Sequence, residues 1–166
     1  MRLFVTVCAL SIAASLSAAI PASAAGDVLS GNMQSFGYLL GAPWNCSTNV
    51  PAMMGRPAYV DQGTATFDTV PGNVVRNHVS TSHYSGDFYF GFSDRMSSYW
   101  QVAADNMGGH SFLTSTDGKT YTGTASMGPM SAQDMVTYTK VSPAKVTVHE
   151  VLSGTNPATF DSTCTR

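Results

Sequence analysis

Few residues in this chain have types and spacings that could carry chemistry, and the histidines come first because they bind metals. The chain has four of them, His78, His83, His110 and His149. Only His78 and His83 are near each other, and a separation of five positions puts them on opposite faces of a strand. A zinc site needs several converging nitrogen or sulfur ligands. The spacing therefore predicts no metal site, and we expect no cofactor.

The carboxylic acids give little support to acid–base or nucleophilic catalysis. Glu150 is the single glutamate, and most of the aspartates fall in predicted turns or on predicted outer faces. The sequence has no Gly-x-Ser-x-Gly elbow, no phosphate-binding glycine loop and no Cys-x-x-Cys pair. A pair assembled by folding, such as His149 with Asp61, stays open because sequence distance does not fix proximity. We expect a protein that is not an enzyme, with catalysis kept as an alternative.

The N-terminal residues have the features of an export segment. Arg2 precedes an apolar stretch over 3–20, Pro21 breaks that stretch, and the small-x-small pattern of a cleavage site follows at 22–24. The alternative is a retained membrane anchor, since the apolar stretch is nearly long enough to span a bilayer. We expect residues 1–25 to be a signal peptide that is removed. Residues 26–166 would then form a single exported domain, periplasmic or secreted.

Two cysteines remain outside this segment, Cys46 and Cys164, near opposite ends of the exported domain. Disulfides form and persist in oxidising compartments outside the cytoplasm. Export therefore favours a disulfide between Cys46 and Cys164 over two free thiols. Such a bond would hold the first and last parts of the domain together, and it suggests a closed β structure.

The composition limits the classes of partner. Only 11% of the residues are charged, the formal net charge is −2, and the lysines and arginines are scattered without a basic run. A surface of this kind attracts neither nucleic acid nor anionic lipid. A domain of about 140 residues is an ordinary size for one hydrophobic core. We expect a monomer that binds no nucleic acid and has no stable membrane insertion after the signal peptide is cleaved.

Short strands are the elements that would position these residues. From Trp44 onward, apolar and polar residues alternate, and turn residues interrupt them about every ten positions, a pattern typical of an antiparallel sandwich or barrel. Asp117-Gly118 is the strongest hairpin signal. The strands are expected near 44–50, 58–69, 73–81, 86–93, 98–105, 109–116, 119–126, 133–141, 144–153 and 158–165.

Alternation along these strands selects candidates for an inner face. A barrel of about eight to ten strands has an interior that side chains fill or that holds one small ligand. A short helix over 33–40, ended by Gly41 and Pro43, would serve as a lid or plug. Core packing alone would also explain inward aromatic side chains. The residues expected to line the interior and contact a ligand are Trp44, Phe67, Phe90, Trp100, Phe112, Tyr121 and His149.

Four segments of the exported domain together carry a family resemblance. They are Leu39-Leu40-Gly41-Ala42-Pro43-Trp44, Phe90-Gly91-Phe92-Ser93-Asp94, Asp117-Gly118-Lys119-Thr120-Tyr121 and Cys164-Thr165-Arg166. The first is similar to the Gly-x-Trp opening of lipocalin-like barrels, with one extra residue before the tryptophan. Over residues 36–166 the chain resembles a bacterial family of uncharacterised lipocalin-like β-barrel proteins. The resemblance implies an all-β, antiparallel, up-and-down barrel of the calycin type that binds a small apolar molecule.

The resemblance also implies roles for particular residues. In lipocalin-like barrels the tryptophan of the opening motif plugs one end and stacks on a basic residue of a late strand, which suggests Trp44 and Arg166. Haem-binding barrels of related architecture carry an axial histidine near the chain end, where this chain has none. His149 is the one plausible substitute, so haem binding is kept only as an alternative.

We therefore expect an exported protein that binds or carries a small apolar molecule. The alternative from a different class is a structural or interaction protein of the cell envelope. Its barrel would be filled by side chains, and its loops would bind a partner. The volume inside the barrel separates the two hypotheses.

Overall fold

A computed structural model describes residues 28–166, except residues 54, 128 and 129. The predicted signal peptide, residues 1–25, lies outside the described residues. The one helix in the described range is neither long nor apolar enough to cross a membrane. Export from the cell stays a prediction.

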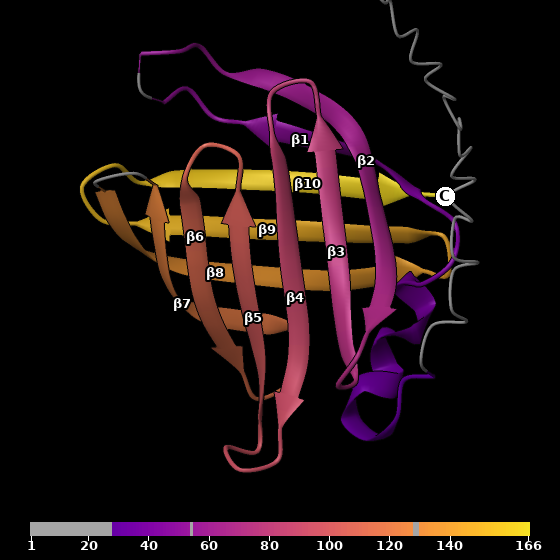
Figure 1. The fold of residues 1–166 in the computed structure, drawn as a ribbon. Coiled ribbons are helices and arrows are strands. Elements are labelled where there is room, and N and C mark those ends of the chain that lie inside the picture. The colour runs from indigo at the N-terminus through magenta and orange to yellow at the C-terminus, as the bar shows by residue number, and fades with distance from the viewer. Residues whose placement is uncertain (1–27, 54, 128–129) are drawn as a thin grey trace, which may run out of the picture.

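Within the described residues, ten antiparallel strands close into an up-and-down barrel, which confirms the predicted fold class. Each strand pairs with the next along the chain, and the last returns to pair with the first (Figure 1). The strands are β1 (Trp44–Val50), β2 (Tyr59–Val70), β3 (Val74–Thr81), β4 (Ser85–Ser93), β5 (Ser98–Asp105), β6 (Gly109–Ser115), β7 (Thr120–Met127), β8 (Met130–Ser142), β9 (Lys145–Ser153) and β10 (Ala158–Thr165).

Turn chemistry explains where the strands end, and the turn between β6 and β7 is a clear example. Gly118 has a φ of +68°, a backbone conformation that side chains other than glycine rarely adopt. The Asp117 carboxylate accepts hydrogen bonds from the backbone N–H groups of Lys119 and Thr120. The predicted Asp-Gly hairpin is therefore confirmed, and it fixes the register of β6 and β7.

The short helix η1 (Gly31–Leu39) covers one end of the barrel (Figure 1). It is a 3-10 helix, and its buried residues Met33, Phe36 and Leu39 recur every third position. That spacing matches three residues per turn, so all three side chains face the barrel. The backbone of Ser30 and the side chain of Asn73 exchange two hydrogen bonds, which fasten the start of η1 to the turn between β2 and β3.

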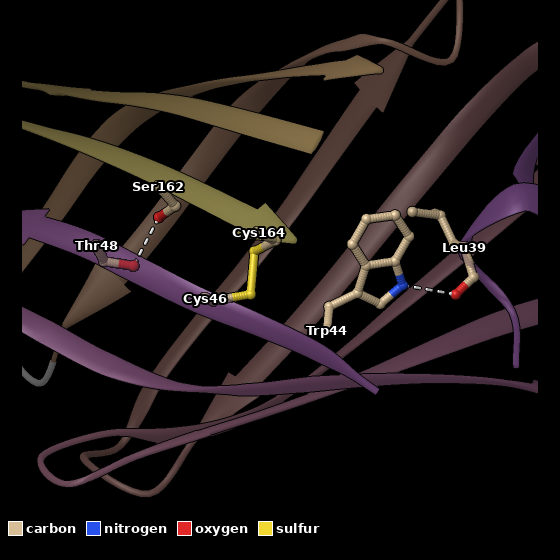
Figure 2. Close-up of a disulfide and its surroundings, with 6 residues drawn as sticks. All are labelled: Leu39, Trp44, Cys46, Thr48, Ser162 and Cys164. Carbon is tan, nitrogen blue, oxygen red and sulfur yellow. Dashed lines mark hydrogen bonds between the residues drawn. A yellow bond between two sulfur atoms is a disulfide. The ribbon is translucent and has the colours of Figure 1, made fainter. Parts of the chain in front are cut away.

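The closing pair of strands, β1 and β10, carries the predicted disulfide. Cys46 and Cys164 are direct cross-strand partners with a Cα–Cα distance of 4.1 Å (Figure 2). Two positions further along the same pair, the hydroxyls of Thr48 and Ser162 are 2.7 Å apart. The sulfur–sulfur bond joins residues separated by 118 positions in sequence. The seam of the barrel is thus held covalently as well as by hydrogen bonds.

Candidate functional site

Aromatic side chains fill the half of the barrel interior nearest η1. The ring centroid of Phe90 lies 5.9 Å from that of Phe36, 6.0 Å from that of Tyr121 and 5.6 Å from that of Tyr138. Phe90 and Tyr121 are almost completely buried. Tilted and edge-to-face ring pairs at these distances stabilise a core beyond the effect of burial alone. This half is packed core rather than a ligand site.

Trp44 and Arg166 seal the same end. The indole Nε1 of Trp44 donates a hydrogen bond of 2.9 Å to the carbonyl oxygen of Leu39 in η1 (Figure 2). The guanidinium carbon of Arg166 lies 4.5 Å from the centroid of the Trp44 ring. Arg166 also donates to the carbonyl oxygens of Tyr38 and Leu40. The stack implied by the lipocalin resemblance is present, and it ties the last strand to η1.

The other half of the interior is lined differently. Val79, Phe88 and Val148 pack against the core there and stay partly exposed. Because alternate residues of a strand face opposite sides of the sheet, exposure of inward side chains means that solvent reaches this half. Several of its other inward positions are small, although Tyr84 covers Gly86 and Asp105 covers Gly109: Gly63, Gly86, Ala103, Gly109, Ser111, Gly123, Ala125 and Ala132.

A surface pocket of about 400 Å³ lies at the rim of this open half. It occupies the space between the β1–β2 connection and the β9–β10 turn. Asn156 spans part of it, with Nδ2 3.2 Å from the sulfur of Met130. The lining residues are Ala52, Met53, Gly55, Arg56, Met130, Asn156 and Pro157.

Two carboxylic acids face the open half from neighbouring strands. Asp134 of β8 is opposite Leu152, and Glu150 of β9 is opposite Val136, so the acids are diagonal neighbours on the inner face. Burial raises the pKa of Asp134 to about 6. Burial first, and then the charge of Asp134, raises the pKa of Glu150 to about 7. Both acids therefore titrate near neutral pH, and we call them the acid pair.

Uncharged polar side chains also face the interior of the barrel. The hydroxyl of Tyr138 donates a hydrogen bond of 2.9 Å to Oε1 of Gln101 across the interior. Burial raises the pKa of the Tyr138 and Tyr84 phenols well above the usual value, so both stay neutral at physiological pH. Asn77, on the inner face of β3, has a buried Oδ1 without a hydrogen-bond partner. The interior thus holds an acceptor atom that has no hydrogen-bond donor among the described residues.

Asp61, at the rim of the open half, belongs to a separate cluster. Its carboxylate accepts hydrogen bonds from the hydroxyls of Thr81 and Ser82 and lies 3.1 Å from Nδ1 of His83. Burial would raise the pKa of Asp61, but these hydrogen bonds outweigh it and lower the pKa. The Ser82 hydroxyl also contacts Nδ1 of His83. A serine–histidine–aspartate triad needs hydroxyl and carboxylate on opposite ring nitrogens, so this cluster is not one.

Four of the seven residues predicted to line the interior do face it. Trp44, Phe90 and Tyr121 are buried in the core, and Phe67 packs against them. Trp44, Phe90 and Tyr121 belong to the filled half, where they contact other side chains. Whether any of the four contacts a ligand stays a prediction.

The predictions for Trp100 and Phe112 are wrong, because both lie on the outer face. The Trp100 ring covers Gly91, where an added Cβ would collide with it. Its neighbour Gln101 faces inward instead and is 1% exposed. Phe112 is 52% exposed, next to the fully buried Leu113. On both strands the residues that face inward are shifted by one position from those predicted.

The prediction for His149 is wrong for the same reason. Its Nδ1 lies 2.7 Å from Oδ1 of Asp161 on the outer face of β10, and Glu150, the next residue, faces inward. Folding brings His149 to Asp161 and not to Asp61, so the acid–base pair considered from the sequence is not assembled.

Asp134 and Glu150 were missed in the sequence analysis, although a signal for them was present. Asp134 comes two residues before Val136, and Glu150 two residues before Leu152, and both of these apolar residues are buried. An acid that alternates with buried apolar residues on one strand shares their face. The expectation that most of the aspartates occupy turns and outer faces does not hold for Asp134 or for Asp61, which are both buried on the inner face.

Comparison with known proteins finds a weak structural similarity and no related family. Neither a protein-family model nor a curated protein matches the chain. Among solved structures, the chain is similar to a redesigned β-barrel, at 16% sequence identity and a TM-score of 0.40. The similarity covers 82% of this chain and 98% of that one.

Proposed function

We propose that this protein binds one small, largely apolar molecule in the open half of its barrel and carries or sequesters it outside the cytoplasm. The observation that carries the proposal is the contrast between the two halves of the interior. One half is packed with aromatic rings, whereas the other combines small inward residues with apolar side chains that solvent reaches. A concave, mostly apolar site with a few polar groups is the usual form of a small-molecule site.

Three further features support this function. The resemblance of residues 36–166 to lipocalin-like barrels implies a small apolar ligand. The disulfide between Cys46 and Cys164 is compatible with an oxidising compartment. The disulfide holds the seam of the barrel closed, and η1 covers one end. A molecule would therefore enter from the opposite end.

The test combines identification of a natural ligand with blockage of the interior. Native mass spectrometry of the protein purified from its own host, followed by organic extraction, should show a stoichiometric adduct. Uptake of the neutral fluorescent probe N-phenyl-1-naphthylamine should fall at least about fivefold in Ala132→Phe, because the ring occupies the open half. The matched control is Gln133→Phe, in which the same ring is added on the outer face.

The outcome decides between a carrier and a filled barrel. Probe uptake that falls in Ala132→Phe and not in Gln133→Phe supports binding inside the barrel. A bare mass together with no probe uptake by the unmodified protein contradicts the proposal. It would favour a barrel that acts through its outer surface and loops.

A further inference from the structure

We propose that the acid pair, Asp134 and Glu150, binds the protonated amino group of the ligand, so that the molecule carried is an apolar amine. The inference rests on the proposed function and narrows it to a class of ligand. It follows from three observations: the position of the two acids, the absence of a protein cation beside them, and an acceptor atom without a partner.

The acid pair is placed where a ligand in the open half would meet it. Asp134 and Glu150 project from adjacent strands toward the interior, and Leu152 and Val148 flank them along β9. Phe160 of β10 is the direct cross-strand partner of Glu150 and also faces inward. The acids are therefore set in apolar surroundings, which suits a molecule with an apolar body and one polar end.

No cation of the protein balances the acid pair among the residues that the structure describes. The ion pairs found there, Arg76–Asp68, His78–Asp87 and His149–Asp161, lie on the outer face, and His83 pairs with Asp61 at the rim. The remaining lysines and arginines occupy turns, the rim or the end covered by η1: Arg56, Arg95, Lys119, Lys140, Lys145 and Arg166.

The other two acids of this end already have protein partners. Asp61 accepts hydrogen bonds from Thr81 and Ser82. Asp105 accepts them from the backbone N–H groups of Met107 and Gly109. Only the acid pair lacks such donors among the described residues at this end. When the two acids are ionised, their negative charge is therefore not neutralised by any described residue.

Asp134 supplies an independent observation that points to a ligand. It is 5% exposed, and its Oδ1 is buried without a hydrogen-bond partner. An unsatisfied buried acceptor is costly and rare in native proteins. A carboxylate oxygen accepts hydrogen bonds, so the group missing at Asp134 among the described residues is a donor.

An ammonium group meets these requirements better than the alternatives. It brings three N–H donors and the positive charge that the acid pair lacks. A carboxylate or phosphate ligand would be repelled by both acids. A divalent metal such as calcium requires six or more oxygen ligands, and the described residues contain no group of three or more His, Cys, Asp or Glu side chains placed to hold one.

The test is a calorimetric titration at pH 8 with three probes that share one apolar body. They are 4-phenylbutylamine, 4-phenyl-1-butanol and 4-phenylbutyrate. We expect the amine to bind about tenfold or more tightly than the alcohol, because hydrogen bonds to charged groups are the strong ones, and we expect the acid to bind most weakly. In Glu150→Gln and in Asp134→Asn the affinity for the amine should fall about tenfold toward that of the alcohol, with the alcohol within about twofold of its original affinity.

Asp161→Asn is the matched control, since it removes one negative charge from the outer face of the next strand and should leave all three affinities unchanged. Equal affinity for amine and alcohol in the unmodified protein overturns the inference and leaves the proposed function standing. An unchanged preference for the amine in both acid variants overturns it as well. If none of the three probes binds and N-phenyl-1-naphthylamine does not bind either, the proposed function fails together with the inference.

Discussion

An acid that faces the interior of a barrel loses much of its hydration, and Glu150 shows the consequence. Burial disfavours its charged form, and the nearby charge of Asp134 adds to that effect. No cation lowers the pKa of either acid. The folded protein therefore keeps a proton on Glu150 at pH values where the unfolded chain has already released it.

The free energy of unfolding should consequently fall as the pH rises. The pKa of Glu150 is about 7 in the folded protein and near 4.5 in the unfolded chain. Between these values the folded state binds more protons, so raising the pH favours the unfolded state. The loss from Glu150 is at most about 3 kcal/mol. Urea denaturation of the ligand-free protein between pH 4.5 and 8 measures it.

Glu150→Gln should remove the part of this pH dependence that Glu150 contributes and leave the protein more stable at pH 8, while Asp134, whose pKa burial raises to about 6, keeps its own smaller part. Asp161→Asn, on the outer face, should keep the pH dependence. A free energy of unfolding that falls equally in Glu150→Gln and in the unmodified protein would show that Glu150 is not buried in this way.

Single inward residues were predictable from the sequence where apolar side chains mark the inner face, as for Phe90 and Tyr121. The prediction failed on β5 because Trp100 is more apolar than Gln101. Apolarity alone therefore places Trp100 on the inner face and Gln101 on the outer face, the reverse of what the structure shows. Gln101 is tolerated inside because Tyr138 donates a hydrogen bond to it across the barrel. A hydrogen bond between strands distant in sequence leaves no trace in the local pattern.

At the scale of elements, η1 confirms the short helix predicted over 33–40, whereas its pitch was not predictable from the sequence. Met33, Phe36 and Leu39 fit three residues per turn as well as the α-helical period, and a run this short does not separate the two periods. Packing against the barrel determines the pitch of the helix, because all three side chains are buried only if they point into the end of the barrel.

Phe36 should be the most sensitive position of η1. Its ring contacts those of Phe90 and Tyr99, and truncation of a buried phenylalanine costs about 3 kcal/mol or more. We expect Phe36→Ala to lower the free energy of unfolding in urea by about that amount. Gln34→Ala, at an exposed position of η1, should change it by less than about 0.5 kcal/mol. Equal effects would mean that η1 does not stabilise the closed end.

The strands themselves were predictable because turn residues mark their ends. Asp117-Gly118 and Pro71-Gly72-Asn73 both fall between strands as expected. The exception is β8, which begins at Met130 and not at 133. Its first residues pair with the end of β7, and this pairing is a property of the sheet rather than of residues 130–132 alone.

At the scale of the whole molecule, closure depends on the pairing of β1 with β10. Among the paired strands they are the farthest apart in sequence, so closing the loop between them has the largest entropic cost. The disulfide between Cys46 and Cys164 removes most of that cost by limiting the unfolded chain. For a separation of 118 residues the stabilisation is about 4–5 kcal/mol.

The variant with Cys46→Ser and Cys164→Ser should therefore unfold at a lower urea concentration, with a loss that approaches this value. The unmodified protein treated with dithiothreitol is the matched comparison and should behave in the same way. Denaturation curves that coincide for the oxidised and reduced protein would show that the disulfide does not stabilise the barrel.

The position of the disulfide also determines how the barrel responds to a mechanical load. β1 and β10 are antiparallel, so the chain leaves the barrel from both strands at the same edge, beside Trp44 and Thr165. A force that pulls the two strand ends apart would first break the contacts of Arg166 with Trp44, Tyr38 and Leu40, and would then break the hydrogen bonds of the seam one after another. Cys46 and Cys164 are next to that edge. Separation of β1 from β10 therefore stops after the pair of Asn45 and Thr165. Beyond that point the disulfide bond carries the force, so the hydrogen bonds between the other strands of the barrel are not loaded.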